Sequence, residues 1–270
     1  MPVNLNPHSS WAEVYDLAYD RSFGEFYNRL TDATIQVITD GIHHGGSIVD
    51  FGAGTGRLSI PLANMNFEVT AVDPCREMLC QLEQKKREGM RLSTVCSKMQ
   101  DFKDSNFDCA LCVFTVLSYL LYEESLKKAL SAAYGALKPN GMLLIDIPSR
   151  TIFQNYSRKD EVIERVVSVI QDSGDIYNYH ETLKVKGANG DESTYTDEFK
   201  IRYWPPEYVL NNLEATGFVF EADLTEYFSG TGSHYWIIYV RFSTVQFEIN
   251  HINIRIFILL LPLPFDIVKL

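Results

Sequence analysis

Apolar strands and amphipathic helices alternate between residues 47 and 147. Each predicted strand is short and apolar, and most are followed by a segment whose apolar residues have helical spacing. Consecutive strands joined through helices lie parallel, with right-handed crossovers. The pattern therefore predicts an α/β fold with a doubly wound, mostly parallel sheet that is covered by helices on both faces. The predicted strands are 47–51, 68–73, 92–96, 109–114 and 142–147, and the predicted helices are 11–39, 58–65, 74–88 and 124–137.

The pattern changes after Pro148. Residues 162–203 read as extended, alternating segments, and Asn189-Gly190 is a typical hairpin turn. These features predict an antiparallel insertion after the fifth strand, at about 150–204, instead of another crossover. The remaining predicted elements are a helix at 206–215, ended by Gly217, and strands at 218–225 and 234–242, which complete a seven-stranded sheet.

One domain is expected over residues 1–243, with the insertion forming a lid over a substrate within it. The segment 244–270 is rich in Ile and Leu and follows the point where the sheet should be complete. This segment could equally be an additional strand, a partner-binding segment or a sequence foreign to the native protein. No role is assigned to it.

A glycine-rich turn follows the first predicted strand. Gly52, Gly54 and Gly56 occupy alternate positions after Asp50, and small ligands bind outside the carboxyl ends of the strands in such sheets. A dinucleotide loop has the spacing G-x-G-x-x-G, whereas here Arg57 stands where its third glycine would be. The preceding carboxylate would repel a pyrophosphate and attract an ammonium group. The turn therefore favours a nucleoside that carries an amino acid over NAD.

Asp73 ends the second predicted strand. An acidic residue there can accept hydrogen bonds from both ribose hydroxyls, although alone it could equally be a helix cap. Its position about 20 residues beyond the glycine turn favours the ribose interpretation.

Several segments together resemble the class I S-adenosylmethionine-dependent methyltransferases over roughly residues 11–242. The segment 15–20, Y-D-L-A-Y-D, is similar to the opening of small-molecule members that methylate the nitrogen of glycine and of amino sugars. The resemblance implies S-adenosyl-L-methionine as cofactor and methyl transfer to a small-molecule acceptor, with amines among the candidates. The segments that carry the resemblance are 50–56, 72–74 with 78–79 after it, 107–108, 137–141 and 202–207 with 217–218 after it.

The resemblance also implies which residues hold the cofactor. The methionyl part would lie on the glycine turn and the ribose on Asp73, while Lys98 stands where the family commonly has an acid that binds the adenine. The implied cofactor-binding residues are Asp50, Gly52, Ala53, Gly54, Gly56, Asp73, Pro74, Met78, Met99, Gln100 and Phe114.

Methyl transfer is an in-line displacement at a sulfonium carbon, so it depends on alignment of the reacting atoms. The positive charge disperses during the reaction, which suits a dry pocket with aromatic walls. Tyr15, Tyr19 and Tyr119 are the predicted catalytic residues of such a wall, with Phe114 beside them.

Composition limits the partners. The net charge of −11 and the pI of about 5.0 leave no basic face for nucleic acid. The longest apolar run, 256–263, is too short for a membrane span of about 20 residues and is interrupted by proline. The N-terminus has no secretory pattern, and the five cysteines lie in predicted core elements, as reduced thiols do. We expect a cytoplasmic monomer or homodimer that binds neither nucleic acid nor membrane.

Cys109 and Cys112 have the C-x-x-C spacing of metal and redox sites. Both lie in a predicted strand, where residues three apart point to opposite faces, so no metal site is predicted. Two other classes of function remain as alternatives: a non-catalytic nucleoside-binding partner protein on the same fold, and, less favoured by the glycine spacing, an NAD-dependent oxidoreductase.

Overall fold

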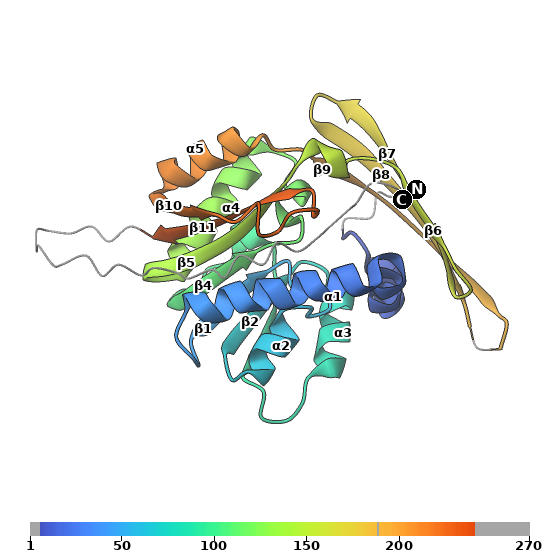
Figure 1. Cartoon of the computed structure of the whole chain (residues 1–270), viewed down its shortest axis with the longest axis horizontal. Coiled ribbons are helices and arrows are strands. Elements are labelled where there is room, and N and C mark those ends of the chain that lie inside the picture. The colour runs from blue at the N-terminus through green and yellow to red at the C-terminus, as the bar shows by residue number, and fades with distance from the viewer. Residues whose placement is uncertain (1–5, 188, 241–270) are drawn as a thin grey trace, which may run out of the picture.

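The computed structural model describes residues 6–187 and 189–240, and its centre is a seven-stranded sheet (Figure 1). The strand order is β10-β11-β5-β4-β1-β2-β3. Only β11 runs antiparallel to its neighbours, β10 and β5, so the predicted mostly parallel, doubly wound sheet is confirmed. The predicted end of the last strand and the segment 244–270 lie outside the described residues. The strands are β1 (Ser47–Phe51), β2 (Glu68–Asp73), β3 (Leu92–Cys96), β4 (Phe107–Cys112), β5 (Leu137–Pro148), β10 (Phe218–Asp223) and β11 (Ser233–Val240).

Helices cover both faces of this sheet, with α1, α2 and α3 on one side and α4 and α5 on the other (Figure 1). Alternate residues of β5 show the division: Leu143 and Ile145 belong to the core under α4 and α5, whereas Met142 and Leu144 belong to the core under α1 and α2. The helices are α1 (Tyr15–Gly41), α2 (Ser59–Asn64), α3 (Arg76–Lys85), α4 (Glu123–Ala136) and α5 (Pro206–Thr216), with 3₁₀ turns η1 (Ser9–Val14), η2 (Met99–Asp101), η3 (Val116–Tyr119) and η4 (Arg150–Ile152).

Cys109 and Cys112 belong to opposite cores, as the strand geometry predicts. Both side chains are fully buried, and burial raises the pKa of each thiol. They therefore act as small apolar core residues. In the described residues, no helix is both long and apolar enough to cross a bilayer.

A second, four-stranded antiparallel sheet lies between β5 and α5 in the chain and projects to one side of the molecule (Figure 1). It confirms the predicted antiparallel insertion after the fifth strand. Its buried face packs Ile163, Leu183 and Val185 against Trp11 and Ala18 of the N-terminal region. The N-terminal region and this sheet therefore share a core of their own. The strands are β6 (Tyr156–Lys159), β7 (Ile163–Ser173), β8 (Ile176–Lys186) and β9 (Glu192–Arg202).

Several predicted boundaries differ from the observed ones, and two of them bear on the site or the sheet. The fourth strand ends at Cys112, because Phe114 and Thr115 adopt φ angles of 64° and 70° and turn the chain out of the sheet. The fifth strand, predicted to start at 142, begins at Leu137.

Gly56 was predicted to bind the cofactor, but the structure gives it a packing role. Its φ is +89°, and a Cβ atom there would lie 2.8 Å from Cγ of Leu82 and 2.9 Å from Cγ1 of Ile60. The glycine lets the start of α2 approach α3 closely, and it is not among the residues that line the cavity described below.

We therefore expect Gly56→Ala to lower the free energy of unfolding by about 2–4 kcal/mol. The alanine would have to adopt a left-handed backbone conformation, and its Cβ would overlap side chains of the core. Urea denaturation measures this change. Gly135→Ala is the matched control, since Gly135 lies in α4 with no atom within 4 Å of a Cβ placed there. It should leave stability unchanged or raise it by up to about 1 kcal/mol. Equal stability of the two variants would contradict the packing role.

Candidate active site

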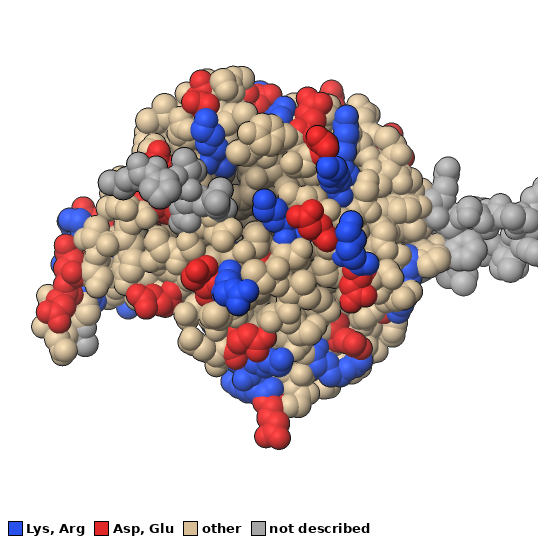
Figure 2. Space-filling view, turned by 180° about the vertical axis from the view of Figure 1, so that it is seen from behind, with Lys and Arg blue, Asp and Glu red and all other residues tan. Residues whose placement is uncertain are grey.

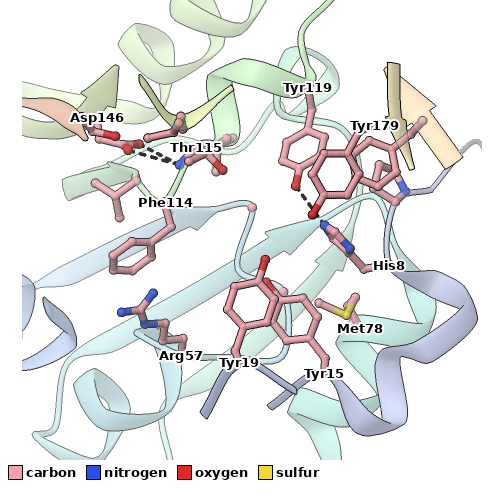
Figure 3. Close-up of a pocket in the computed structure, with 18 of the residues that line it drawn as sticks. His8, Tyr15, Tyr19, Arg57, Met78, Phe114, Thr115, Tyr119, Asp146 and Tyr179 are labelled. Atoms are coloured by element: carbon pink, nitrogen blue, oxygen red, sulfur yellow. Dashed lines mark hydrogen bonds between the residues drawn. The ribbon is translucent and has the colours of Figure 1, made fainter. Parts of the chain in front are cut away.

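A large cavity of about 1760 Å³ opens at the carboxyl ends of the parallel strands. Its walls come from the turns after β1, β2, β4 and β5, from α1, and from the inner face of the antiparallel sheet (Figure 3). Elements far apart in the chain thus meet over the sheet edge where open α/β folds bind ligands.

The glycine turn and Asp73 lie side by side in this cavity. The backbone N–H of Gly54 donates to Oδ2 of Asp73 at 2.9 Å, and the N–H of Cys75 donates to Oδ1 at 2.8 Å. Gly52, Ala53 and Gly54 all line the cavity, and a Cβ on Gly52 would lie 2.4 Å from Val116. Burial raises the pKa of Asp73, while these two amides lower it. The structure therefore brings together the two features on which the sequence interpretation depends.

Asp50 lies beneath the same turn and is 4% exposed. The Ser59 hydroxyl donates to its Oδ2 at 2.6 Å. Burial, together with the negative charge of Asp73, raises the pKa of Asp50 to about 7, even though the bond from Ser59 lowers it. This carboxyl group is thus a buried acid at the edge of the cavity, where a cationic group would favour its ionised form.

The predicted nucleoside-binding residues also reach the cavity: Pro74, Met78, Met99 and Gln100 line it. Lys98 lines it as well. Asp101 is exposed and is not part of the lining.

An aromatic wall borders the same cavity, and its Tyr15 packs against Met78. The rings of Tyr15 and Tyr19 stack with centroids 4.4 Å apart, and Tyr119 and Phe114 face them across the cavity (Figure 3). Burial raises the pKa of Tyr15 and of Tyr119 well above the usual value for tyrosine. Both phenols therefore stay protonated and uncharged. Each can donate or accept a hydrogen bond.

His8 is a buried partner of this wall that the sequence did not reveal. Its Nε2 lies 2.9 Å from the Tyr119 hydroxyl, and its backbone N–H donates to Asp197 at 2.5 Å. Burial and the nearby charge of Arg165 lower the pKa of His8 to about 3, so its imidazole is neutral. It can therefore accept the Tyr119 proton in a hydrogen bond and fix the direction of that hydroxyl.

Arg57 is a buried cation of the cavity wall. Its guanidinium carbon lies 3.5 Å from the centroid of the Tyr27 ring and 3.7 Å from that of Phe114. It also donates to the Thr31 hydroxyl and to the carbonyl of Tyr27. In the sequence, the position of Arg57 directly after the glycine turn argued only against a dinucleotide loop and did not reveal these contacts.

A buried ion pair links β7 and β8 of the antiparallel sheet, and its arginine also contacts α1. Nε of Arg165 donates to Glu181 at 2.5 Å, both side chains are nearly inaccessible, and Nη1 donates to the Ser22 hydroxyl at 3.3 Å. The Arg165 guanidinium also lies 4.6 Å from the centroid of the Tyr19 ring. The aromatic wall is thus anchored to the second sheet through one charged contact.

The sheet order and the covering helices define an α/β fold of the methyltransferase type. Residues 48–141 match the methyltransferase domain family. The chain is 28% identical to the putative methyltransferase YqeM of Bacillus subtilis (strain 168), over 53% of this chain and 56% of that protein. It is 27% identical to a glycine/sarcosine N-methyltransferase of Parasynechococcus marenigrum (strain WH8102), over 60% and 59%. The chain thus spans little more than half the length of these relatives.

Solved structures share the whole arrangement. An S-adenosylmethionine-dependent methyltransferase from Clostridium acetobutylicum superposes with a TM-score of 0.75 at 19% identity, covering 85% of this chain and 99% of that one. The sugar N-methyltransferase KedS8 from Streptoalloteichus superposes with a TM-score of 0.70 at 22% identity, covering 89% and 95%. The chain therefore has the fold of the S-adenosylmethionine-dependent methyltransferases, and its residues 48–141 match their domain family.

The Arg165–Glu181 pair leads to a test of stability. In Glu181→Gln the buried guanidinium loses its countercharge, and we expect the free energy of unfolding to fall by about 3 kcal/mol. Glu198→Gln is the control, since Glu198 is exposed on β9 and only approaches His180. Chemical denaturation of both variants measures the difference. A loss below 1 kcal/mol in Glu181→Gln would show that the pair does not anchor the sheet.

Proposed function

We propose that this protein transfers a methyl group from S-adenosyl-L-methionine to a small-molecule acceptor bound in the cavity. The observation that carries the proposal is the contact between Gly54 and Asp73 at the strand ends. The cavity around it is lined by all the cofactor-binding residues that the family resemblance implies except Gly56. The volume of about 1760 Å³ exceeds the roughly 300–1,000 Å³ of a typical small-molecule site. Cofactor and acceptor therefore have room to bind together.

The residues present fit the cofactor. Each carboxylate oxygen of Asp73 accepts one backbone bond and retains capacity for another, as two ribose hydroxyls require. Asp50 supplies the negative charge that an α-ammonium group needs, and Gly52 and Gly54 leave the backbone open to it. Met78 and Met99 offer apolar side chains to the nucleoside base. When bound, S-adenosyl-L-methionine supplies an electrophilic methyl carbon attached to a sulfonium.

The chain's own residues would orient the acceptor and exclude water. Tyr15, Tyr19 and Tyr119 present aromatic faces and fixed hydroxyls, and the rings favour a nearby positive charge without forming a covalent or ionic bond to it. The antiparallel sheet adds Tyr179 and Phe199 to the lining and so screens the cavity from solvent. Alignment within such a walled site supplies much of the rate enhancement in displacement reactions.

A small molecule is the best-supported acceptor. The relatives named for glycine, sarcosine and sugar nitrogen methylation all act on small amines. Figure 2 shows acidic and basic side chains interspersed over one face of the protein, with no continuous basic surface there for a phosphate backbone. An acceptor that fits under the second sheet is therefore favoured over nucleic acid.

Asp73→Asn is the first test. The substitution keeps the size of the side chain but removes its charge, so two charge-assisted hydrogen bonds to the ribose weaken. We expect the affinity for S-adenosyl-L-methionine to fall about 100-fold, equivalent to about 3 kcal/mol. Isothermal titration measures it. Asp223→Asn, an exposed carboxylate on β10, should bind like the unaltered protein.

The activity itself is tested by a screen of small amines, alcohols and thiols that detects release of S-adenosylhomocysteine. Turnover with at least one acceptor is the expected result. If the cofactor binds but no acceptor is methylated, the protein is a binder on this fold instead of an enzyme. If the cofactor does not bind, the proposed function is wrong.

A further inference from the structure

Asp146 is a buried carboxyl group that the cofactor site does not use. It lies near the end of β5, is 1% exposed, and lines the cavity beside Thr115 and Phe114 (Figure 3). Among the described lining residues, Asp50 and Asp73 are the only other acids, and both are accounted for at the cofactor end. Asp146 therefore belongs to the acceptor end of the cavity.

A strained turn holds this carboxyl group in place. Phe114 and Thr115 both have positive φ angles, 64° and 70°, which side-chain-bearing residues rarely adopt and which β-branched threonine particularly disfavours. The turn directs the Thr115 N–H to Asp146, at 3.0 Å from Oδ1 and 3.3 Å from Oδ2. It also places the Phe114 ring against Arg57. Such strain persists where the surroundings enforce it, and it is concentrated at functional sites.

The surroundings of Asp146 provide hydrogen bonds but no ion pair. Thr115 and the Ser233 side chain donate to it, and the charge of Arg57 acts on it from the other side of the Phe114 ring (Figure 3). Tyr235 from β11 and Cys112 from β4 are the other titratable groups beside it. No salt bridge to Asp146 is present among the described residues. Burial raises its pKa to about 7, despite the bonds and the charge of Arg57.

We propose that Asp146 binds the protonated amino group of the acceptor and takes a proton from it, so that the methylated substrate is an amine. This inference rests on the proposed function and assigns its substrate class. A ligand ammonium would give the buried carboxylate the direct ion pair that it lacks among the described residues. The aromatic rings around it favour a cation as well.

The proton transfer is what makes the amine reactive. An ammonium nitrogen has no lone pair, so one N–H bond must break before attack, and its proton goes to a carboxylate oxygen of Asp146. The freed lone pair then forms the new N–C bond to the methyl carbon, while the C–S bond breaks and its electron pair stays on sulfur. A carboxylate is far too weak a base to ionise an alkyl hydroxyl, whose pKa is close to the value of about 16 for water. Asp146 therefore selects amines over alcohols.

The test compares primary amines with their alcohol isosteres, such as benzylamine with benzyl alcohol and 2-aminoethanol with ethylene glycol. Binding to the protein saturated with S-adenosylhomocysteine is measured by isothermal titration at pH 8. We expect at least one amine of the panel to bind tenfold or more tightly than its isostere. In Asp146→Asn and in Asp146→Ala this preference should disappear, while Asp223→Asn should retain it. A panel without any preferred amine, or a preference that survives in the folded Asp146 variants, would overturn the inference.

The pH dependence adds a second readout. Primary amines stay protonated between pH 6 and 8, because their pKa lies near 10, as for lysine. Asp146 gains its charge as the pH rises through about 7. The preference for the amine should therefore grow about tenfold from pH 6 to pH 8 in the unaltered protein. In Asp146→Asn the preference for the amine should not change with pH, although Asp50, the other titrating acid of the cavity, remains.

The two proposals fail in different ways. If S-adenosylhomocysteine does not bind the unaltered protein, the proposed function fails. If it binds the unaltered protein and the Asp146 variants equally, but amines are not preferred or their preference is independent of pH, only the role of Asp146 fails.

Discussion

One hydrogen bond, from the Gly54 N–H to the Asp73 carboxylate, joins the two halves of the candidate site. It depends on the parallel register of β1 and β2, in which Phe51 pairs with Val72, so that both strands end at the same level. The Gly52 N–H donates to the Val72 carbonyl and continues this pairing into the turn. A carboxylate buried at this point would be unfavourable alone. The backbone amides of Gly54 and Cys75 make it tolerable and direct it into the cavity.

The sheet could be predicted because its signals are local. The strands at 47–51, 68–73 and 92–96 were predicted with their observed bounds, since a strand buried on both faces is a short apolar run whatever lies around it. The end of β4 could not be predicted in this way. Phe114 and Thr115 continue the apolar, strand-like composition, but in the structure they have left-handed conformations and contact Asp146 and Arg57 from other elements.

The residues of the candidate site also fall into those with a local sequence signal and those without one. Residues that belong to a motif, such as Asp50, Gly54 and Asp73, were placed correctly at the cavity because their spacing carries the information. His8 and Arg165 carry no such spacing. His8 meets Asp197 across 189 positions of the chain, and a single sequence contains no trace of that contact. Asp146 is intermediate, since a carboxylate inside an apolar strand was visible but was interpreted only as part of the strand.

The N-terminal segment couples the two ends of the cavity. His8 and Ser10 donate hydrogen bonds to β9, and Trp11 packs into the core of the antiparallel sheet. One residue further on, Ala12 packs against Cys75 and Met78 at the nucleoside end. Because η1 contacts both the antiparallel sheet and α3, it cannot move relative to one of them without disturbing its contact with the other. The position of the second sheet is therefore linked to that of α3, and the same few contacts set the shape of the cavity on both sides.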